Sequence, residues 1–189
     1  GTGRPTGKEN WKTYYQFMNN QLTELLTNYG PIGASWFDGV WDHPKSFNWQ
    51  LEEQYALIHK LQPACLVGNN HHRVPYVGED FQMFERDLPG ENTSGYSDGQ
   101  EVSALPLETC ETMNRTWGYN IEDQHYKSTK TLIQLLVRAA GKNANLLMNI
   151  GPQPNGELPA VAVQRMKEMG EWMATYGETI YGTRGGDVE

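Results

Sequence analysis

Amphipathic helical segments alternate along this chain with short apolar runs, and this alternation limits the possible fold more than any other feature. The helical segments have apolar residues at spacings of three and four, whereas the apolar runs have the length and composition of strands. The expected helices are 11–28, 48–61, 129–140 and 159–176, and the expected strands are 32–37, 64–68, 81–84 and 145–150. This order predicts an α/β fold, a parallel sheet with helices outside it. About four strands are too few to close a barrel of eight.

The strand 32–37 ends at a carboxylate. It runs from Ile32 to Phe37 between the turn signals Gly30-Pro31 and Asp38-Gly39. This pattern predicts a parallel strand that is buried on both faces. In α/β barrels the carboxyl end of a strand faces the active site, so Asp38 is a candidate catalytic group. The alternative is that Asp38 caps a turn through its side chain, with Gly39 supplying the unusual backbone angles.

Polar side chains follow the next two expected strands as well. Asn69, Asn70, His71 and His72 follow the second strand, and Glu85 follows the third. The segment 86–119 is rich in loop-forming residues. Its only strand signals are at 105–110 and around Trp117.

Charge and composition exclude several classes of protein. The chain has 189 residues, enough for one domain with a real core. Its formal net charge is -8 with scattered Lys and Arg, which argues against a nucleic-acid surface. No apolar run approaches membrane-spanning length and no signal peptide opens the chain. The polar start 1–7 lacks an initiator Met and is typical of a loop rather than of a natural N-terminus.

The two cysteines have no metal-ligand spacing. Each of Cys65 and Cys110 is expected to fill core space as a small apolar residue, although a disulfide between them stays open. We expect no metal and no other cofactor.

Aromatic residues are numerous, with six Trp and ten Tyr. Sugar rings have apolar faces that stack on aromatic rings, and their hydroxyls bind carboxylates, amides and imidazoles, so this content suggests a sugar site. The alternative is that most Trp side chains cover helices. Those expected at strand ends or in loops are Trp36, Trp41, Trp49, Trp117, Tyr76, Tyr96 and Tyr119.

Several sequence blocks together resemble one enzyme family. The segment 15–39, with the core Trp36-Phe37-Asp38-Gly39, resembles the nucleophile strand of the α-L-fucosidases of glycoside hydrolase family 29. The resemblance continues, in the order of the family and over nearly the whole chain, through 78–85, 107–110 with 117–120, 145–152, 170–172 and 177–181.

This resemblance implies a (β/α)8-like TIM barrel that hydrolyses terminal α-L-fucose from glycans or glycoconjugates with retention, by double displacement. It implies that Asp38 is the nucleophile and Glu85 the general acid/base. Glu108 is the competing candidate for the acid/base. If it does not have that role, we expect it to be a structural carboxylate. We favour Glu85 because a retaining pair lies roughly 5 Å apart and a strand-end loop can deliver it.

The family resemblance also suggests substrate-binding residues. Trp117 matches the aromatic position that contacts the sugar, and His71 lies where some members carry an arginine beside it. Trp36 and Glu108 complete the expected binding set.

The family's earlier strands, whose ends supply histidines and a tryptophan for the fucose hydroxyls, have no counterpart here. We therefore expect residues 1–189 to be the C-terminal half of a catalytic domain: a fragment, a clipped chain or one of two pieces, with the N-terminal half as its partner. An open half-barrel would expose strand edges. A periplasmic or secreted location is expected.

Two other functions stay open at this point. One is a retaining glycosidase of different sugar specificity on the same barrel. The other is a non-catalytic carbohydrate-binding half-domain.

Overall fold

The computed structural model describes residues 8–44 and 46–186 of the chain. These residues form two compact units. The N-terminal unit extends to His71 and includes Pro75–Phe81, and the C-terminal unit comprises His72–Val74 and the residues from Gln82 onward. None of the helices in the described ranges is long and apolar enough to cross a membrane.

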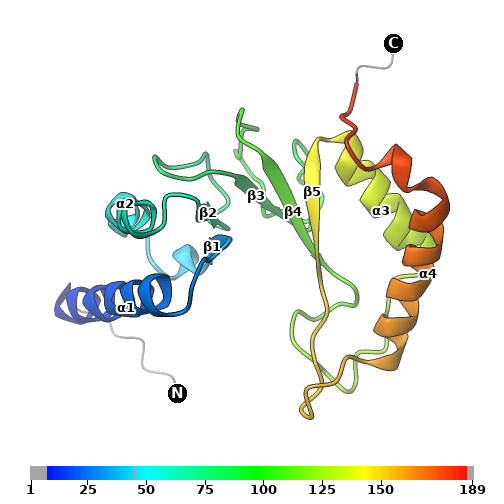
Figure 1. Ribbon diagram of the computed structural model, residues 1–189, viewed down its shortest axis with the longest axis horizontal. Helices are drawn as coiled ribbons and strands as arrows, with labels where there is room; N and C mark the ends of the chain where they lie inside the picture. Colours follow the sequence, from blue (N-terminus) through cyan, green and yellow to red (C-terminus); the bar gives the residue numbers. More distant parts are fainter. Residues whose placement is uncertain (1–7, 45, 187–189) are drawn as a thin grey trace. The chain divides into compact units, whose positions relative to one another are not determined.

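In the N-terminal unit, helices cover a pair of parallel strands (Figure 1). The elements are α1 (Lys8–Asn28), β1 (Ala34–Phe37), the 3-10 turn η1 (Val40–Asp42), α2 (Leu51–Leu61) and β2 (Leu66–Asn69). Helix α1 packs against α2, and α2 packs against β2. The core contains Leu26, Tyr55, Ile58, Cys65 and Val67. The register pairs Phe37 with Asn69, so residues that follow β1 and β2 become neighbours.

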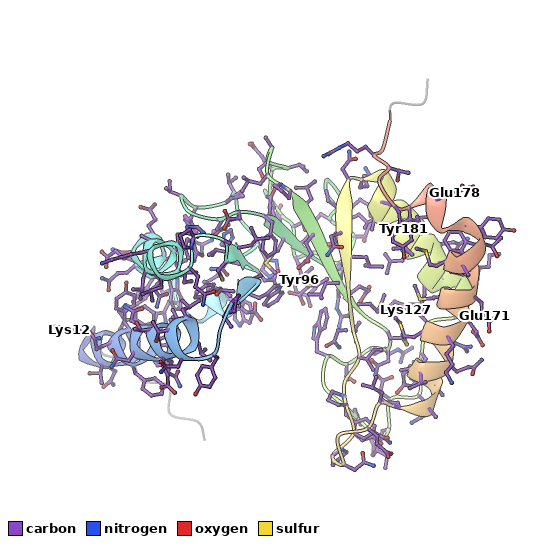
Figure 2. All side chains as sticks on the ribbon, in the orientation of Figure 1. Lys12, Tyr96, Lys127, Glu171, Glu178 and Tyr181 are labelled. Carbon is purple, nitrogen blue, oxygen red and sulfur yellow. The ribbon has the colours of Figure 1, made fainter. Side chains whose placement is uncertain are left out.

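In the C-terminal unit, three parallel strands lie in the order β3-β4-β5. The elements are β3 (Gln82–Glu85), β4 (Leu107–Thr112), α3 (Thr129–Gly141), β5 (Ala144–Asn149), α4 (Ala160–Tyr176) and the 3-10 turn η2 (Gly177–Thr179). Helix α3 packs against both β5 and α4, on the same side of β5 (Figure 1). Side chains, Lys127 among them, fill the space between the sheet and these helices (Figure 2). The core there contains Met113, Leu132, Ala162 and Met169.

The predicted alternation of helices with parallel strands is confirmed. Over the ranges that the structure describes, the chain forms five strands rather than four, because the weak signal at 105–110 is a full strand, β4. The strand signal around Trp117 is wrong, since that residue lies in bends between β4 and α3. Cys65 and Cys110 are both buried and neither forms a disulfide, which confirms the core interpretation and excludes a bridge between them.

The prediction that the strand at 32–37 is buried on both faces is wrong. Exposed and half-buried residues alternate along β1, and Trp36 is 41% exposed. Along the described chain β1 pairs only with β2. Ala34 and Trp36 point to the exposed face of the strand, while Phe37 packs on the core of the unit.

The strands form two sheets instead of the single sheet that was expected. Among the described residues β2 pairs with no strand besides β1, and Asp80 shows the reason. The Asp80 backbone N–H donates to Val67 O (2.8 Å), and its carboxylate accepts from the Val67 N–H (2.7 Å). These two bonds occupy the edge of β2 that another strand would otherwise use.

Candidate active site

Asp38 extends the exposed face of β1. Side chains two residues apart on a strand point to the same face, so Trp36 and Asp38 lie together there, and both are exposed. Gly39 follows with φ 91°, a left-handed conformation that favours glycine. The chain therefore turns directly after the carboxylate. The backbone part of the turn interpretation is thus correct, and it leaves the Asp38 side chain at the carboxyl end of the strand.

The residue after β2 bonds to this carboxylate. The Asn70 N–H donates to Phe37 O (2.9 Å), and its Nδ2 donates to Asp38 Oδ1 (3.3 Å). Asn70 is almost fully buried. This amide donor restricts the orientation of the Asp38 carboxylate.

His71 is part of a buried polar network. Its Nε2 lies 2.9 Å from Glu79 Oε1, which also accepts from the Tyr55 hydroxyl (3.0 Å). That hydroxyl in turn accepts from Asn69 Nδ2 (2.8 Å). Burial, and then the Glu79 carboxylate, raise the pKa of Tyr55, so the phenol stays protonated and donates.

In the C-terminal unit, Glu85 is the last residue of β3 and its side chain is mostly buried. His72 Nε2 lies 3.4 Å from Glu85 Oε2, and the His72 ring stacks on Tyr96 with centroids 5.6 Å apart. His72 has φ 56° and Arg86 has φ 59°. Left-handed non-glycine residues store backbone strain and cluster at functional sites, and here they contact and follow Glu85.

Arg86 connects the end of β3 to Trp117. Its guanidinium lies 5.2 Å from the Trp117 ring centroid and donates to Arg115 O (2.9 Å). The Trp117 carbonyl accepts from Asn149 Nδ2 (2.8 Å) at the end of β5. Residues at the carboxyl ends of β3 and β5 therefore contact Trp117, Arg86 at its ring and Asn149 at its backbone carbonyl.

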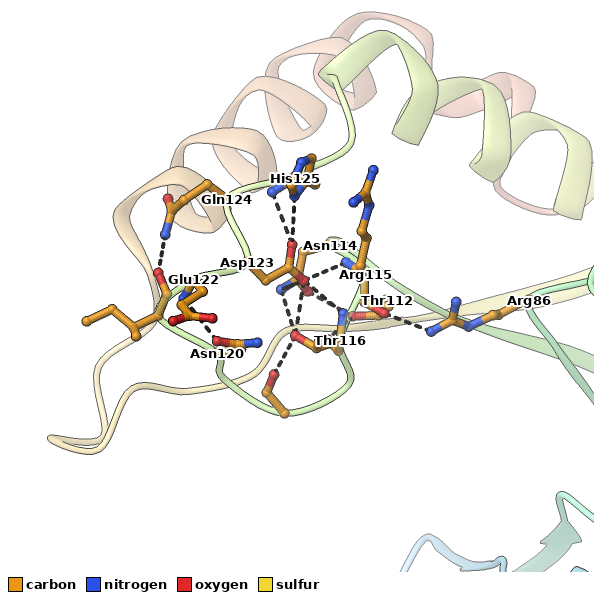
Figure 3. Close-up of polar contacts among 12 residues, drawn as sticks. Arg86, Thr112, Asn114, Arg115, Thr116, Asn120, Glu122, Asp123, Gln124 and His125 are labelled. Carbon is orange, nitrogen blue, oxygen red and sulfur yellow. Dashed lines mark hydrogen bonds and ion pairs between the residues drawn. The ribbon is translucent and has the colours of Figure 1, made fainter.

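Asp123 holds the segment 114–123, which we call the Trp117 loop (Figure 3). Its Oδ2 accepts from the N–H groups of Arg115 and Thr116, each at 2.9 Å. It also accepts from Asn114 Nδ2 at 3.0 Å. Burial alone would raise the pKa of Asp123, but these bonds and one from the His125 N–H outweigh it and lower the pKa to about 2. The carboxylate is ionised at neutral pH and fastens both ends of the loop.

Glu108 occupies a different level of the sheet. It pairs with Met83 in the register, whereas Glu85 pairs with Cys110, so Glu108 lies two residues closer to the amino ends of the strands. Its Oε2 accepts from Asn145 Nδ2 (2.9 Å) on β5.

The α-L-fucosidase family model matches residues 2–178. The chain belongs to the α-L-fucosidase family. The resemblance predicted from the sequence blocks is thereby confirmed, and the match covers both units of the chain.

Similar proteins extend well beyond this chain. The plasma α-L-fucosidase of Rattus norvegicus is 30% identical over 171 residues, which cover 86% of this chain and 35% of that protein. α-L-Fucosidase isoenzyme 1 from Paenibacillus thiaminolyticus aligns with a TM-score of 0.78 and 33% identity, over all of this chain and 44% of its own. The Thermotoga maritima α-fucosidase, solved with a mechanism-based inhibitor, aligns with a TM-score of 0.71 and 27% identity. The alignment covers 97% of this chain and 38% of that protein's chain. The chain thus spans about a third of the curated relative it matches.

The six predicted site residues divide between the two units. Asp38, Trp36 and His71 belong to the N-terminal unit, and Glu85, Glu108 and Trp117 belong to the C-terminal unit. Within the described ranges no group of three His, Cys, Asp or Glu residues is arranged to hold a metal ion.

Sequence reasoning missed the partners that hold these residues. Glu79, Arg86 and Asp123 received no role, although Glu79 stands in a family block. His72 was noted only as polar. Each contacts a predicted residue or its loop. The charge of Arg86 directly after a strand is a signal that the sequence shows, whereas Glu79 and Asp123 lie within loops and have no such signal.

Proposed function

We propose that the protein containing this chain is a retaining exo-α-L-fucosidase that releases terminal α-L-fucose from glycans or glycoconjugates. The observation that carries the proposal is the Asp38 carboxylate, which ends a parallel strand and accepts a hydrogen bond from Asn70. Family membership over residues 2–178 supports fucose as the sugar. It does not favour a glycosidase of other specificity or a binding half-domain.

In the proposed reaction the Asp38 carboxylate attacks the anomeric carbon of fucose while the glycosidic bond breaks. Glu85 gives its proton to the departing oxygen, and a covalent fucosyl-enzyme ester forms. Glu85, now a carboxylate, removes a proton from water, which attacks the same carbon and releases Asp38. Two inversions give fucose with its α configuration retained.

Glu85 is preferred to Glu108 as the acid/base because of its level in the sheet. Catalytic groups in α/β barrels come from the carboxyl ends of strands. Glu85 ends β3, whereas Glu108 is the second residue of β4 and bonds to Asn145. These positions support a structural role for Glu108 as a carboxylate that joins β4 to β5.

The aromatic and imidazole groups supply sugar recognition in this proposal. Trp117, held by Arg86 and Asn149, offers an apolar face to the sugar. Trp36 offers another on the exposed face of β1, and His71 offers hydrogen bonding next to Asn70.

We further propose that the complete catalytic domain is a (β/α)8-like barrel to which this chain contributes strands and helices of the C-terminal half, with N-terminal segments contributing the rest. Two observations support this: the chain covers 44% of a similar fucosidase structure, and β1 has an exposed face.

The test is azide rescue of two variants of the full-length protein. Asp38→Gly should lower turnover of an aryl α-L-fucoside by several orders of magnitude, and azide should restore part of it by attacking once, giving the β-fucosyl azide. Glu85→Ala should instead give the α-fucosyl azide, because azide then attacks the ester after one inversion has occurred. The unmodified protein with azide is the control. Near-normal turnover by Asp38→Gly would contradict the proposal.

A further inference from the structure

Thr112, the last residue of β4, is fully buried and has no role in the proposed reaction. In the register of the sheet it pairs with Asn149, the last residue of β5. Its hydroxyl oxygen, Oγ1, accepts a hydrogen bond from Asn149 Nδ2 at 3.0 Å. The same nitrogen also donates to the Trp117 carbonyl at 2.8 Å. The two strand-end side chains therefore form a bonded pair that holds the backbone of Trp117.

The single proton of the Thr112 hydroxyl is directed at the same loop. Two acceptors lie 3.1 Å from Oγ1, namely Asn114 Oδ1 and the Thr116 carbonyl (Figure 3). Asn114 begins the Trp117 loop, and Thr116 directly precedes Trp117. A hydroxyl can donate once and still accept, so the bond from Asn149 does not compete with these contacts. The Thr112 hydroxyl therefore links the end of the sheet to the loop through both its donor and its acceptor function.

The backbone of Thr112 is held as well. Its N–H donates to Glu111 Oε1 (2.7 Å), and its carbonyl accepts from Lys127 Nζ (2.7 Å). The N–H of the next residue, Met113, donates to the Asn149 carbonyl (3.1 Å). Because these bonds fix the backbone, the Thr112 hydroxyl has a defined position from which it can orient the loop.

We propose that Thr112 is a positioning residue that sets the place of the Trp117 ring, acting through Asn149 and the backbone of the loop. This inference rests on the proposed function, in which Trp117 offers an apolar face to the sugar. Trp117 is half-buried, so part of its surface is accessible. A shift of its backbone moves the ring relative to the sugar, and misplacing such a group by about 1 Å is enough to slow catalysis. Thr112 itself is buried and acts without touching the substrate.

Thr109 provides a matched control on the same strand. It is also fully buried, and its hydroxyl donates to Asp87 O at 3.3 Å. Residues three apart on a strand point to opposite faces, so Thr109 and Thr112 lie on different sides of β4. Thr109→Val therefore removes a buried hydroxyl from β4 without removing a bond to the Trp117 loop. Thr112→Ser keeps the hydroxyl and removes only a methyl group, so it tests whether the hydrogen bonds are the cause.

The first experiment follows the Trp117 ring by fluorine NMR in the full-length protein labelled with fluorotryptophan. The Trp117 signal, assigned by its loss in Trp117→Phe, should shift or broaden in Thr112→Val. It should keep its position in Thr109→Val and in Thr112→Ser. An unchanged signal in Thr112→Val, or an equal change in Thr109→Val, would overturn the inference.

The second experiment determines whether the effect on catalysis passes through Trp117. With an aryl α-L-fucoside, Thr112→Val should lower kcat/KM about tenfold, the size of one hydrogen bond, and Thr112→Ser should stay within about threefold of the unmodified protein. In a Trp117→Ala background, Thr112→Val should lower kcat/KM less than about twofold, since the ring that it positions is absent. An equal loss in both backgrounds would show that Thr112 acts on the fold in general and would overturn the inference.

The two proposals fail in different ways. If the unmodified protein does not cleave fucosides, the proposed function is wrong, and the fluorine signal still decides whether Thr112 positions the ring. If fucosides are cleaved and Thr112→Val changes neither the signal nor kcat/KM, the positioning role is wrong. Should Thr112→Val not fold, Asn149→Ala breaks the same connection at its half-buried end and should move the Trp117 signal. An unchanged signal in that variant would overturn the inference.

Discussion

A single added methyl group at Gly151 should displace the Trp117 loop. Gly151 follows β5 and is buried against the backbone of that loop. A Cβ at this position would lie 2.4 Å from Tyr119 N and 2.6 Å from Gly118 C, whereas ordinary contacts begin at 3.4 Å. Both neighbours are backbone atoms, so no flexible side chain can move aside.

The size of the effect follows from these distances. The difference between 3.4 and 2.4 Å means that the loop must move by about 1 Å. Overpacking of this kind costs about 2 kcal/mol, which lowers Tm by about 4–8 °C in a domain of this size. Misplacing a substrate-binding group by about 1 Å costs about 100-fold in rate. We therefore expect Gly151→Ala to reduce kcat/KM for an aryl fucoside about 100-fold.

The assay compares kcat/KM and Tm of Gly151→Ala with those of Gly170→Ala in the full-length protein. Gly170 lies inside α4, and a Cβ there would meet nothing within 4 Å. Alanine is the better helix former by about 1 kcal/mol, so Gly170→Ala should retain activity and gain slightly in Tm. If Gly151→Ala also kept activity within twofold of the unmodified protein, the reasoning about the Trp117 loop would be refuted.

Three further predictions concern the acid/base, acid stability and the chain itself. Glu85→Ala should slow fucosides with poor leaving groups far more than activated aryl fucosides, because only the former need a proton; this signature in Glu108→Ala alone would reverse the assignment. The pKa of Asp123 is lowered from 3.8 to about 2, so its stabilising effect is complete above about pH 4 and is lost as the pH falls toward 2. Asp123→Asn should therefore flatten the dependence of Tm on pH in that range, and unchanged dependence would contradict the role of Asp123. Residues 1–189 expressed alone should show no measurable fucosidase activity, and addition of the N-terminal part of the domain should restore it; robust hydrolysis by the purified monomeric chain would exclude the half-barrel.

The helices were predictable because their signals are local. The expected ranges 129–140 and 159–176 match α3 and α4 within one residue at each end. Helix α2 begins at Leu51 and not at 48, since Gln50 has the left-handed φ of 55°. That conformation is uncommon outside glycine and has no clear signal in the sequence.

Strand β4 lacks the continuous apolar run that identifies the other strands. Four of its six residues are Glu or Thr, and two of these, Thr109 and Thr112, are fully buried. Their hydroxyls donate to Asp87 O and Asn114 Oδ1, and these bonds make burial possible. Asp87 is distant from Thr109 in the sequence, so the polar composition of β4 gives only a weak strand signal at 105–110.

The sequence predicted the site residues at the strand ends but not the residues that bond to them. Asp38 and Glu85 could be identified as carboxylates at strand ends, a pattern visible in one dimension. The bond from Asn70 to Asp38 and the contact of His71 with Glu79 depend on register and on a returning loop. The two interpretations of the Trp side chains, stacking on a sugar and covering helices, fit different residues. Trp36 is exposed, whereas Trp49 packs against Trp11 of α1.

The identity of the nucleophile can be tested by covalent trapping. A fluorinated fucosyl fluoride, which forms the fucosyl-enzyme ester quickly and releases it slowly, would be incubated with the full-length protein, followed by proteolysis and mass spectrometry. The account predicts one label per active site, on the peptide that contains Asp38, and none in Asp38→Gly. A stoichiometric label on a different carboxylate, or hydrolysis that inverts the anomeric centre, would contradict it.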